Sequence, residues 1–459
     1  MTGIQILSLI GLLAAVIGLA VARRVRPAVF WALVGLPLVL VRFAGTYRST
    51  MEACGLTVAP SRWRLLVLRA ASREREIRPV PPKIRRIRPT TTGLRVRLRL
   101  APGQEPDDVA AATERLRHTW GVHGVHVHPV KPGVIELRLV GFDVLRKVVM
   151  PRKTPGAGPL SIPVAVRDDA TVFLRDYLVV PHALTLGATL SGKSVYVRNL
   201  IAGLAPQPVA LVGIDCKRGV EQAPFAPRFT ALATDQAQAA KLLPALVAEM
   251  EARFDLIRSW QGLSQSTQAE SITSDIWGLP DAVRPVPIVL LIDEVAELFF
   301  IPSAKDEKRR DQMVTELIRL AQLGRSAGIF IEACGQRFGS ELGKGATMLR
   351  AQLTGRVVHR VNDIETARMG LGDIAPEAMA SACEIHPDRP GVAVAGNTSG
   401  GWSRIRTPFL TLADAATTCR TFAHLTPEIA ALAPFRPPRP VPAPVADRPS
   451  LVKPVPVTD

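Results

Sequence analysis

The sequence predicts an α/β protein whose largest part is a doubly wound domain, a parallel sheet covered by helices on both faces. Three observations lead to this fold class. Short apolar runs alternate with helical stretches from about residue 160, a glycine-rich loop joins one such run to a helix at 187–194, and two longer apolar runs occupy the first 41 residues. Strands that are apolar throughout are typical of parallel sheets buried on both faces.

Length and charge set the scale of the molecule. The 459 residues suffice for two or three domains, and the net charge of +17 favours a polyanionic partner, either nucleic acid or an anionic bilayer surface. The five cysteines lie far apart and lack the short paired spacing of a metal site or a disulfide framework. We therefore expect reduced thiols in a cytosolic domain.

Residues 1–45 are predicted to form a membrane anchor. The run 3–22 is uncharged and long enough to span a bilayer, and the shorter run 27–41 is interrupted by Pro37 and framed by Arg26 and Arg42. Together they predict a transmembrane helical hairpin. The arginines that follow the second run place the bulk of the chain, including the large domain, on the cytoplasmic side of the cell membrane.

Two segments connect this anchor to the large domain. Residues 46–92 are predicted to be a basic linker, because 72–92 are rich in arginine and proline and show almost no apolar face. Residues 93–159 are predicted to be a small α/β module. It contains alternating strands at 93–100, 124–130 and 134–140 and a helical stretch at 106–120.

Residues 160–433 form the predicted doubly wound domain. Its apolar runs, each expected to be a buried strand, lie at 183–187, 208–215, 287–294, 328–334, 356–361 and 391–396. The remaining segment, 434–459, is too rich in proline to fold and is expected to be a disordered tail.

The glycine-rich loop has the pattern of a phosphate-binding loop, and it follows an apolar strand and opens a helix. In that setting backbone N–H groups and the helix N-terminus face an anion. Lys193 is expected to reach the β- and γ-phosphates of ATP, and the Ser194 hydroxyl to ligate Mg²⁺. The nucleotide-binding residues of this loop are predicted to be Gly187, Ala188, Thr189, Leu190, Ser191, Gly192, Lys193 and Ser194.

Two later strands carry polar groups at their ends. The run 287–292 ends in Asp293 and Glu294, of which we expect Asp293 to bind Mg²⁺, directly or through water, and Glu294 to activate the attacking water as general base. The run 328–334 leads to Gln336, whose amide is predicted to sense the γ-phosphate or to orient water.

These motifs resemble the motor domain of the FtsK/SpoIIIE family. The resemblance covers about residues 160–410 and rests on VPHALTLGATLSGKS, IDCKRGVE, EMEARFDLI, IVLLIDEVAEL, LAQLGRSAGIFIEACGQR and LTGRVVHRV. It implies a RecA-like P-loop NTPase that pumps double-stranded DNA as a membrane-tethered homo-hexamer, and the modest length and high arginine content are similar to the actinobacterial conjugative branch, which implies other transfer proteins as partners. Leu190 stands where the family usually has a third loop glycine, and no room remains for the family's winged-helix DNA reader.

The resemblance leaves one residue role and the cargo open. Arg325 or Arg356 is expected to complete a neighbouring subunit's site as an arginine finger. A second reading keeps the ATPase but moves protein, as related motors of type VII secretion do. A third is a membrane scaffold that binds nucleotide without hydrolysis, against which the Asp293–Glu294 pair argues.

Overall fold

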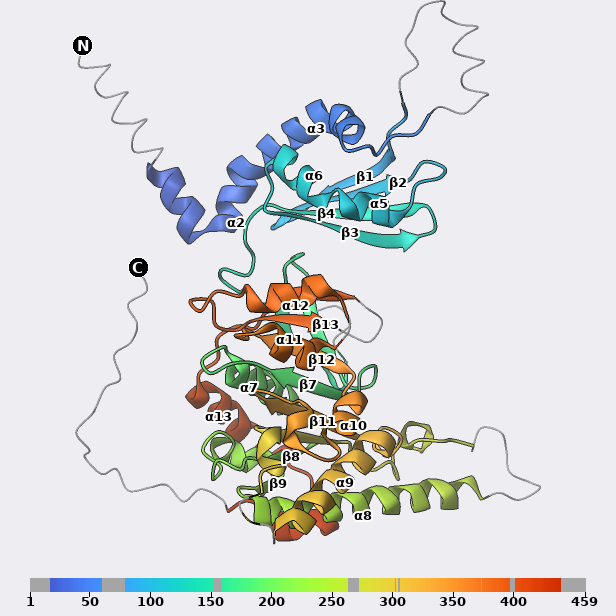
Figure 1. Cartoon of the computed structure of the whole chain (residues 1–459), viewed down its shortest axis with the longest axis vertical. Coiled ribbons are helices and arrows are strands. Elements are labelled where there is room, and N and C mark those ends of the chain that lie inside the picture. Colours follow the sequence, from blue (N-terminus) through green and yellow to red (C-terminus); the bar gives the residue numbers. More distant parts are fainter. Residues whose placement is uncertain are drawn as a thin grey trace, which may run out of the picture.

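The computed structural model describes residues 17–59, 79–151, 158–262, 272–301, 303, 306–372, 374–396 and 401–438. They form a small α/β module and a larger α/β domain, which follow one another along the long axis of the molecule (Figure 1). The segments between these ranges, and the proline-rich stretch from residue 439 onward, lie outside the described residues.

The small module contains a four-stranded antiparallel sheet in the order β1-β2-β4-β3. Its strands are β1 (Lys83–Pro89), β2 (Gly93–Arg99), β3 (Gly124–Lys131) and β4 (Val134–Val140), and its short helices are α5 (Pro106–Ala111) and α6 (Thr113–Trp120). Strand β1 corrects the prediction of a linker over 46–92. Ile84 pairs with Leu98 and faces the core, so apolar and charged side chains do alternate along β1. The strand has so few apolar residues among its arginines that this alternation is not recognisable in the sequence.

The N-terminal helices correct the predicted boundary at residue 45. Helix α2 (Pro27–Phe30), the π-helical turn η1 (Trp31–Gly35) and α3 (Leu36–Ala53) are continuous, and 27–53 is the one described segment long and apolar enough to cross a membrane. Its buried side chains Val39, Phe43, Tyr47 and Met51, each four residues apart, join the core of the small module. The helix continues past residue 45 because these four side chains pack against the sheet of the small module. Of the other predicted span, 3–22, residues 3–16 lie outside the described part.

The large sheet has ten strands in the order β6-β5-β14-β13-β12-β7-β11-β10-β8-β9. Six are parallel: β12 (Gly355–His359), β7 (His182–Leu186), β11 (Ile329–Gly335), β10 (Ile288–Ile292), β8 (Ala210–Ile214) and β9 (Phe229–Ala233). The others, β13 (Val392–Gly396), β14 (Trp402–Arg406), β5 (Ser161–Arg167) and β6 (Val172–Asp176), extend the sheet antiparallel. The run 391–396 is therefore an antiparallel strand, whereas the sequence suggests a parallel one.

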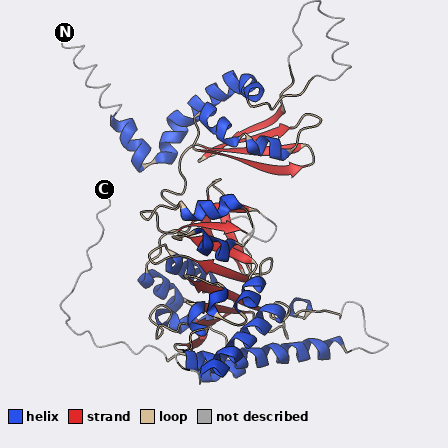
Figure 2. Ribbon diagram, viewed as in Figure 1, coloured by secondary structure: helices blue, strands red, loops and turns tan. Residues whose placement is uncertain are grey.

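Helices cover both faces of this sheet, which confirms the predicted α/β class (Figure 2). One face carries α7 (Lys193–Leu204) and α13 (Leu412–Thr421), and the other carries α8 (Gln236–Gln261), α9 (Glu307–Leu323), α10 (Ala346–Gln352), α11 (Ile364–Leu371) and α12 (Pro376–Cys383). Strand β10 serves both cores, since Leu290 packs toward the α8 side while Val289 and Leu291 pack toward the α7 side. Short 3₁₀ helices lie at Ala223–Arg228, Ile276–Gly278, Val295–Leu298, Ser340–Leu342, Ala423–Leu425 and Ala430–Phe435.

Polar caps fix where several of these helices begin. The side chain of Asp235 accepts a hydrogen bond from the backbone of Gln238 at the start of α8, and Asp363 does the same for Thr366 in α11. Each such cap satisfies a backbone donor that the first turn of a helix leaves free.

Candidate nucleotide-binding site

The loop 187–194 lies between the C-terminal end of β7 and the first turn of α7, near the centre of the ten-stranded sheet. Both of its glycines are required by close packing. A Cβ atom on Gly192 would lie 2.3 Å from the backbone nitrogen of Gly391, and one on Gly187 would lie 2.5 Å from Ser191 Oγ. Gly192 also has a φ of +103°, which side-chain-bearing residues rarely adopt.

Neighbouring strand ends hold the loop in place through backbone hydrogen bonds. The amide of Gly187 donates to Gly335 at the end of β11 (3.2 Å), and the amide of Ala188 donates to Arg360 after β12 (2.9 Å). On the other side, the amide of Gly391 donates to the carbonyl of Ser191 (2.9 Å). These backbone hydrogen bonds therefore fix the position of the loop at the end of the sheet.

Leu190 is the residue in this loop that departs from the family pattern. It adopts a left-handed backbone conformation with φ of +62°, the conformation that a glycine would take without strain. Such a conformation costs a residue with a side chain on the order of 1 kcal/mol. Its side chain is 88% exposed, so the apolar group projects from the rim of the site and leaves the loop interior free.

The two carboxylates predicted at the end of β10 lie beside this loop. Glu294 Oε2 is 3.4 Å from Lys193 Nζ, and both side chains are about one-tenth exposed. The other oxygen of Glu294 accepts a hydrogen bond from the backbone N–H of Gln336 (3.3 Å). The structure thus brings the predicted lysine, the predicted general base and the end of β11 together in one buried cluster.

Asp293 has a partner that the sequence did not identify. Its Oδ2 lies 2.7 Å from the ammonium of Lys217, which follows β8. Partial burial lowers the pKa of Lys217, but the hydrogen bond to Asp293 and the nearby Glu294 raise it by more, so the net shift is upward. Lys217 is therefore a cation in direct contact with the predicted metal ligand, and the signal for it was the motif IDCKRGVE at the end of an apolar strand.

The residues predicted to hold Mg²⁺ have the right chemistry for that ion. Ser194 lies in the first turn of α7, and Asp293 follows β10, which is two strands away from β7 across the sheet. Mg²⁺ at nucleotide sites takes oxygen ligands, usually one or two from the protein and the rest from phosphates and water. A hydroxyl and one carboxylate fit that requirement.

The side chains of Gln336 and Arg325 are both exposed, and they lie beyond opposite ends of β11. Gln336 follows the C-terminal end of β11, on the side of the phosphate loop. Arg325 precedes the N-terminal end of the same strand, and because β11 is parallel to β7 it lies at the edge away from the loop of its own chain. A role for Arg325 in this chain's own site is therefore excluded by topology, whereas a role toward another subunit is not.

Arg356 lies inside the sheet and not at its edge. It pairs with Leu184 of β7, and its guanidinium donates to the backbone carbonyls of Arg350 (2.7 Å) and Gly370 (3.4 Å). Burial, with a smaller contribution from Arg350, lowers its pKa to about 10. Another arginine, the half-buried Arg360, lies beside the loop, and its guanidinium donates to the carbonyl of Thr189 (3.4 Å).

Fold and site together define a P-loop ATPase. Residues 145–340 match the model of the FtsK/SpoIIIE family, and residues 19–141 match that of the actinomycete conjugal transfer protein N-terminal domain. The transfer protein TraSA of Streptomyces ambofaciens is 57% identical over 87% of this chain and 95% of its own length. The chain therefore belongs to the FtsK/SpoIIIE family.

More distant relatives agree with this assignment. The DNA translocase FtsK of Tropheryma whipplei (strain TW08/27) is 28% identical over 62% of this chain and 38% of its own length. Among solved structures, the pCW3 conjugation coupling protein TcpA, as a monomer with ATPγS, superposes with a TM-score of 0.51 over 84% of this chain and 99% of its own, at 16% identity. That likeness supports the fold.

Proposed function

We propose that this protein is a membrane-anchored, ATP-driven translocase of double-stranded DNA that acts in conjugative transfer between cells. One observation carries the proposal: the buried contact between Lys193 of the phosphate loop and Glu294 at the end of β10, in a chain that matches a transfer protein over nearly its whole length. A lysine for phosphate and a carboxylate for water at one sheet edge are the parts that ATP hydrolysis requires.

Lys193 and Ser194 are the groups that receive the nucleotide. In the structure the ammonium of Lys193 contacts Glu294, and we expect it to turn to the β- and γ-phosphates when ATP enters, which frees the carboxylate. Ser194 and Asp293 would hold Mg²⁺, which would supply positive charge to neutralise the phosphates. Lys217 contacts Asp293 at 2.7 Å, which orients that carboxylate, and it would compete with the ion for it.

Glu294 is the proposed general base. Its Oε1 is anchored by the backbone N–H of Gln336, so the carboxylate has a fixed position from which to accept a proton from water. Gln336 follows directly after β11 on the same edge, and we propose that its exposed amide contacts the γ-phosphate or the attacking water. The arginine that completes the site from a neighbouring subunit is, on this proposal, Arg325, because Arg356 already donates to two carbonyls of its own chain.

DNA is the proposed cargo and a homo-hexamer the proposed assembly. The relatives named as DNA translocases and the net charge of +17 support a polyanionic cargo. Helix 27–53 is the proposed anchor in the cell membrane, and the ATPase domain then faces the cytoplasm, where ATP is available. Other transfer proteins are proposed partners.

Duplex-dependent ATP hydrolysis by the detergent-solubilised full chain tests the proposal. We expect basal hydrolysis to rise several-fold with a linear duplex, and Lys193→Ala to abolish both rates. Hydrolysis that responds to an unfolded secretion-type polypeptide but not to DNA would favour the protein-moving alternative. Nucleotide binding without any hydrolysis would favour the scaffold.

A further inference from the structure

The outer face of the small module's sheet carries three pairs of like charges. Residues directly opposite each other on neighbouring strands share a face, and the register of β1 and β2 places Lys83 opposite Arg99, Arg86 opposite Arg97, and Arg88 opposite Arg95. The other face of the sheet is apolar and packs against α3, α5 and α6. Six cations therefore line one side of a single hairpin.

Acidic groups neutralise the other half of this face. On β4, Glu136 contacts Arg138 at 3.2 Å, and it also reaches across to Arg97 at 3.4 Å. Asp169, in the turn after β5 of the large domain, contacts Arg138 at 2.6 Å and His128 of β3 at 3.1 Å. Within the described residues, none of the remaining five cations makes an ion pair or a side-chain hydrogen bond; they are Lys83, Arg86, Arg88, Arg95 and Arg99.

This arrangement is unfavourable for the isolated sheet. Like charges directly opposite one another destabilise a strand pair, by up to about 1 kcal/mol each. Charges on an edge strand such as β1 do protect a sheet against unwanted pairing. That explanation does not extend to β2, which is an inner strand, with β1 on one side and β4 on the other. The repulsion among the arginines of β2 would be offset if this face bound an anionic ligand.

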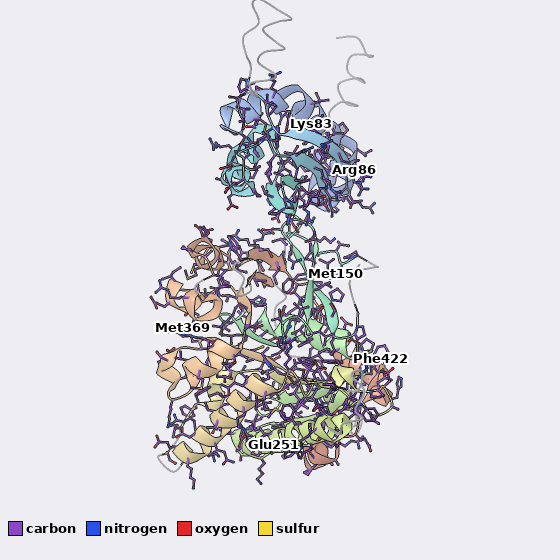
Figure 3. All side chains as sticks on the ribbon, turned by 90° about the vertical axis from the view of Figure 1, so that its right-hand side faces the viewer. Lys83, Arg86, Met150, Glu251, Met369 and Phe422 are labelled. Atoms are coloured by element: carbon purple, nitrogen blue, oxygen red, sulfur yellow. The ribbon has the colours of Figure 1, made fainter. Side chains whose placement is uncertain are left out.

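We propose that the outer face of the β1–β2 hairpin binds the phosphate backbone of duplex DNA, at a site separate from the ATPase domain. The choice of DNA rests on the proposed function. The orientation of the face supports DNA over lipid, because the candidate membrane helix packs on the opposite side of the sheet and Asp169 joins the outer face to the large domain. Figure 3 labels Lys83 and Arg86 on the small module, with Met150 between that module and the large domain.

The dimensions of the face suit a duplex. The residues from Arg95 to Arg99 span about 13 Å along β2, and a duplex of that length carries about eight phosphate charges. Next to the face lies a cavity of about 970 Å³, which is lined on one side by β3 and Arg138 and on the other by residues of the large domain, including Asp168, Asp169 and Trp402. Through Arg138 the outer face of the small module's sheet therefore borders the large domain.

Salt-dependent duplex binding by the full chain in detergent tests the proposal. In the test variant, Arg86→Gln, Arg88→Gln and Arg95→Gln are combined. We expect its affinity for a fluorescent 30-base-pair duplex at about 0.1 M salt to fall at least roughly tenfold, and the slope of log affinity against log salt to decrease by up to about three, because each lost phosphate contact releases fewer counterions. The corresponding Arg→Lys variant should keep the slope.

A charge-matched control removes three arginines from the helical side of the same module: Arg48→Gln, Arg115→Gln and Arg117→Gln. It should bind the duplex like the natural chain. The melting temperature of the test variant should not fall, because two of the three repulsive pairs are relieved, which separates loss of a ligand from loss of the fold.

The outcomes also separate this inference from the proposed function. Unchanged duplex affinity and salt slope in the test variant would overturn the inference, even with normal DNA-stimulated hydrolysis. Unchanged duplex affinity together with lost binding to phosphatidylserine vesicles would assign the face to the membrane surface and equally overturn it. Loss of duplex binding in the test variant, in a protein whose hydrolysis never responds to DNA, would support the inference and contradict the proposed function.

Discussion

Lys193 and Glu294, which contact each other, have the two main roles in the proposed ATP hydrolysis: phosphate binding and activation of water. We expect Lys193→Ala to lose nucleotide binding, because it removes the cation that meets the phosphates. Glu294→Gln should bind ATP and hydrolyse it at least about a hundredfold more slowly, since only the base is lost. Equilibrium binding of a fluorescent ATP analogue and steady-state phosphate release measure the two effects.

Glu297→Gln is the matched control for the general base. Glu297 lies three residues further on, in the exposed part of the turn Val295–Leu298, and its substitution should leave both measurements unchanged. Near-normal turnover by Glu294→Gln would remove Glu294 from the proposed role.

His359 makes the stability of the ATPase domain depend on pH. Burial behind the loop, against Tyr196, lowers the pKa of His359 to about 4, more than the nearby backbone groups raise it. The unfolded chain therefore takes up a proton first as the pH falls, so the stability that is fully present above pH 6.5 declines between pH 6.5 and about 4, by up to about 3 kcal/mol. His359→Phe should reduce the pH dependence of the unfolding free energy over this window, and the exposed His386→Gln should not. Equal pH profiles for the natural chain and His359→Phe would contradict this.

At the residue scale the sequence located the loop and the carboxylates but not their neighbours. A phosphate loop and the acids after a strand are continuous in sequence, and their spacing alone indicates chemistry. Lys217, His359 and Arg360 reach the site from three-dimensional packing. The left-handed backbone conformation of Leu190 also depends on the contacts of the loop and could not be predicted from the sequence.

The turn 389–391 links the small module to the phosphate loop. Arg389 contacts Asp143 at 2.5 Å, the backbone of Gly391 holds Ser191, and Arg406 donates to the carbonyls of Leu145 and Arg146 (2.7 Å each). Residues 143–146 belong to the segment that joins the two parts of the chain. A movement of the small module would therefore be transmitted to the phosphate loop through these contacts.

Breaking this link should weaken nucleotide binding without unfolding the domain. We expect Arg389→Gln to raise the KM for ATP several-fold, since the turn that supports the loop loses its anchor. Arg404→Gln is the control, because Arg404 lies on β14 like Arg406 but contacts Glu384 and Ser381, not residues 143–146. A KM for Arg389→Gln equal to that of Arg404→Gln would show that the link does not reach the site.

Element prediction failed where the surroundings, and not local sequence, decide the outcome. Strand β1 is so rich in arginine that its pattern resembles a linker, and its pairing with β2 is what makes it a strand. The run 391–396 has the apolar composition of a parallel strand, and only chain connectivity makes β13 antiparallel. The apolar runs of β7, β8, β10 and β11 were identified correctly because each is buried on both faces.

At the scale of the whole molecule, the candidate membrane helix and the small module are one packed unit. Phe43 is buried against Tyr47 and Trp120, whereas Val41 on the same helix is 73% exposed. We expect Phe43→Ala to lower the unfolding free energy of the module by about 3–5 kcal/mol in detergent, because it leaves a cavity in the core. Val41→Ala should cost far less. Equal small effects from both would mean that the helix does not pack on the sheet.

The central claim is that ATP hydrolysis at the Lys193–Glu294 site moves this protein along duplex DNA. Displacement of a third strand from a DNA triplex, recorded in real time with the reconstituted full chain, measures that movement directly. The account predicts ATP-dependent displacement by the natural chain, with a delay that grows with the distance between the loading site and the triplex, and none by Glu294→Gln. Displacement that is absent from a membrane-inserted protein with demonstrated ATP hydrolysis, or that persists unchanged in Glu294→Gln, would contradict it.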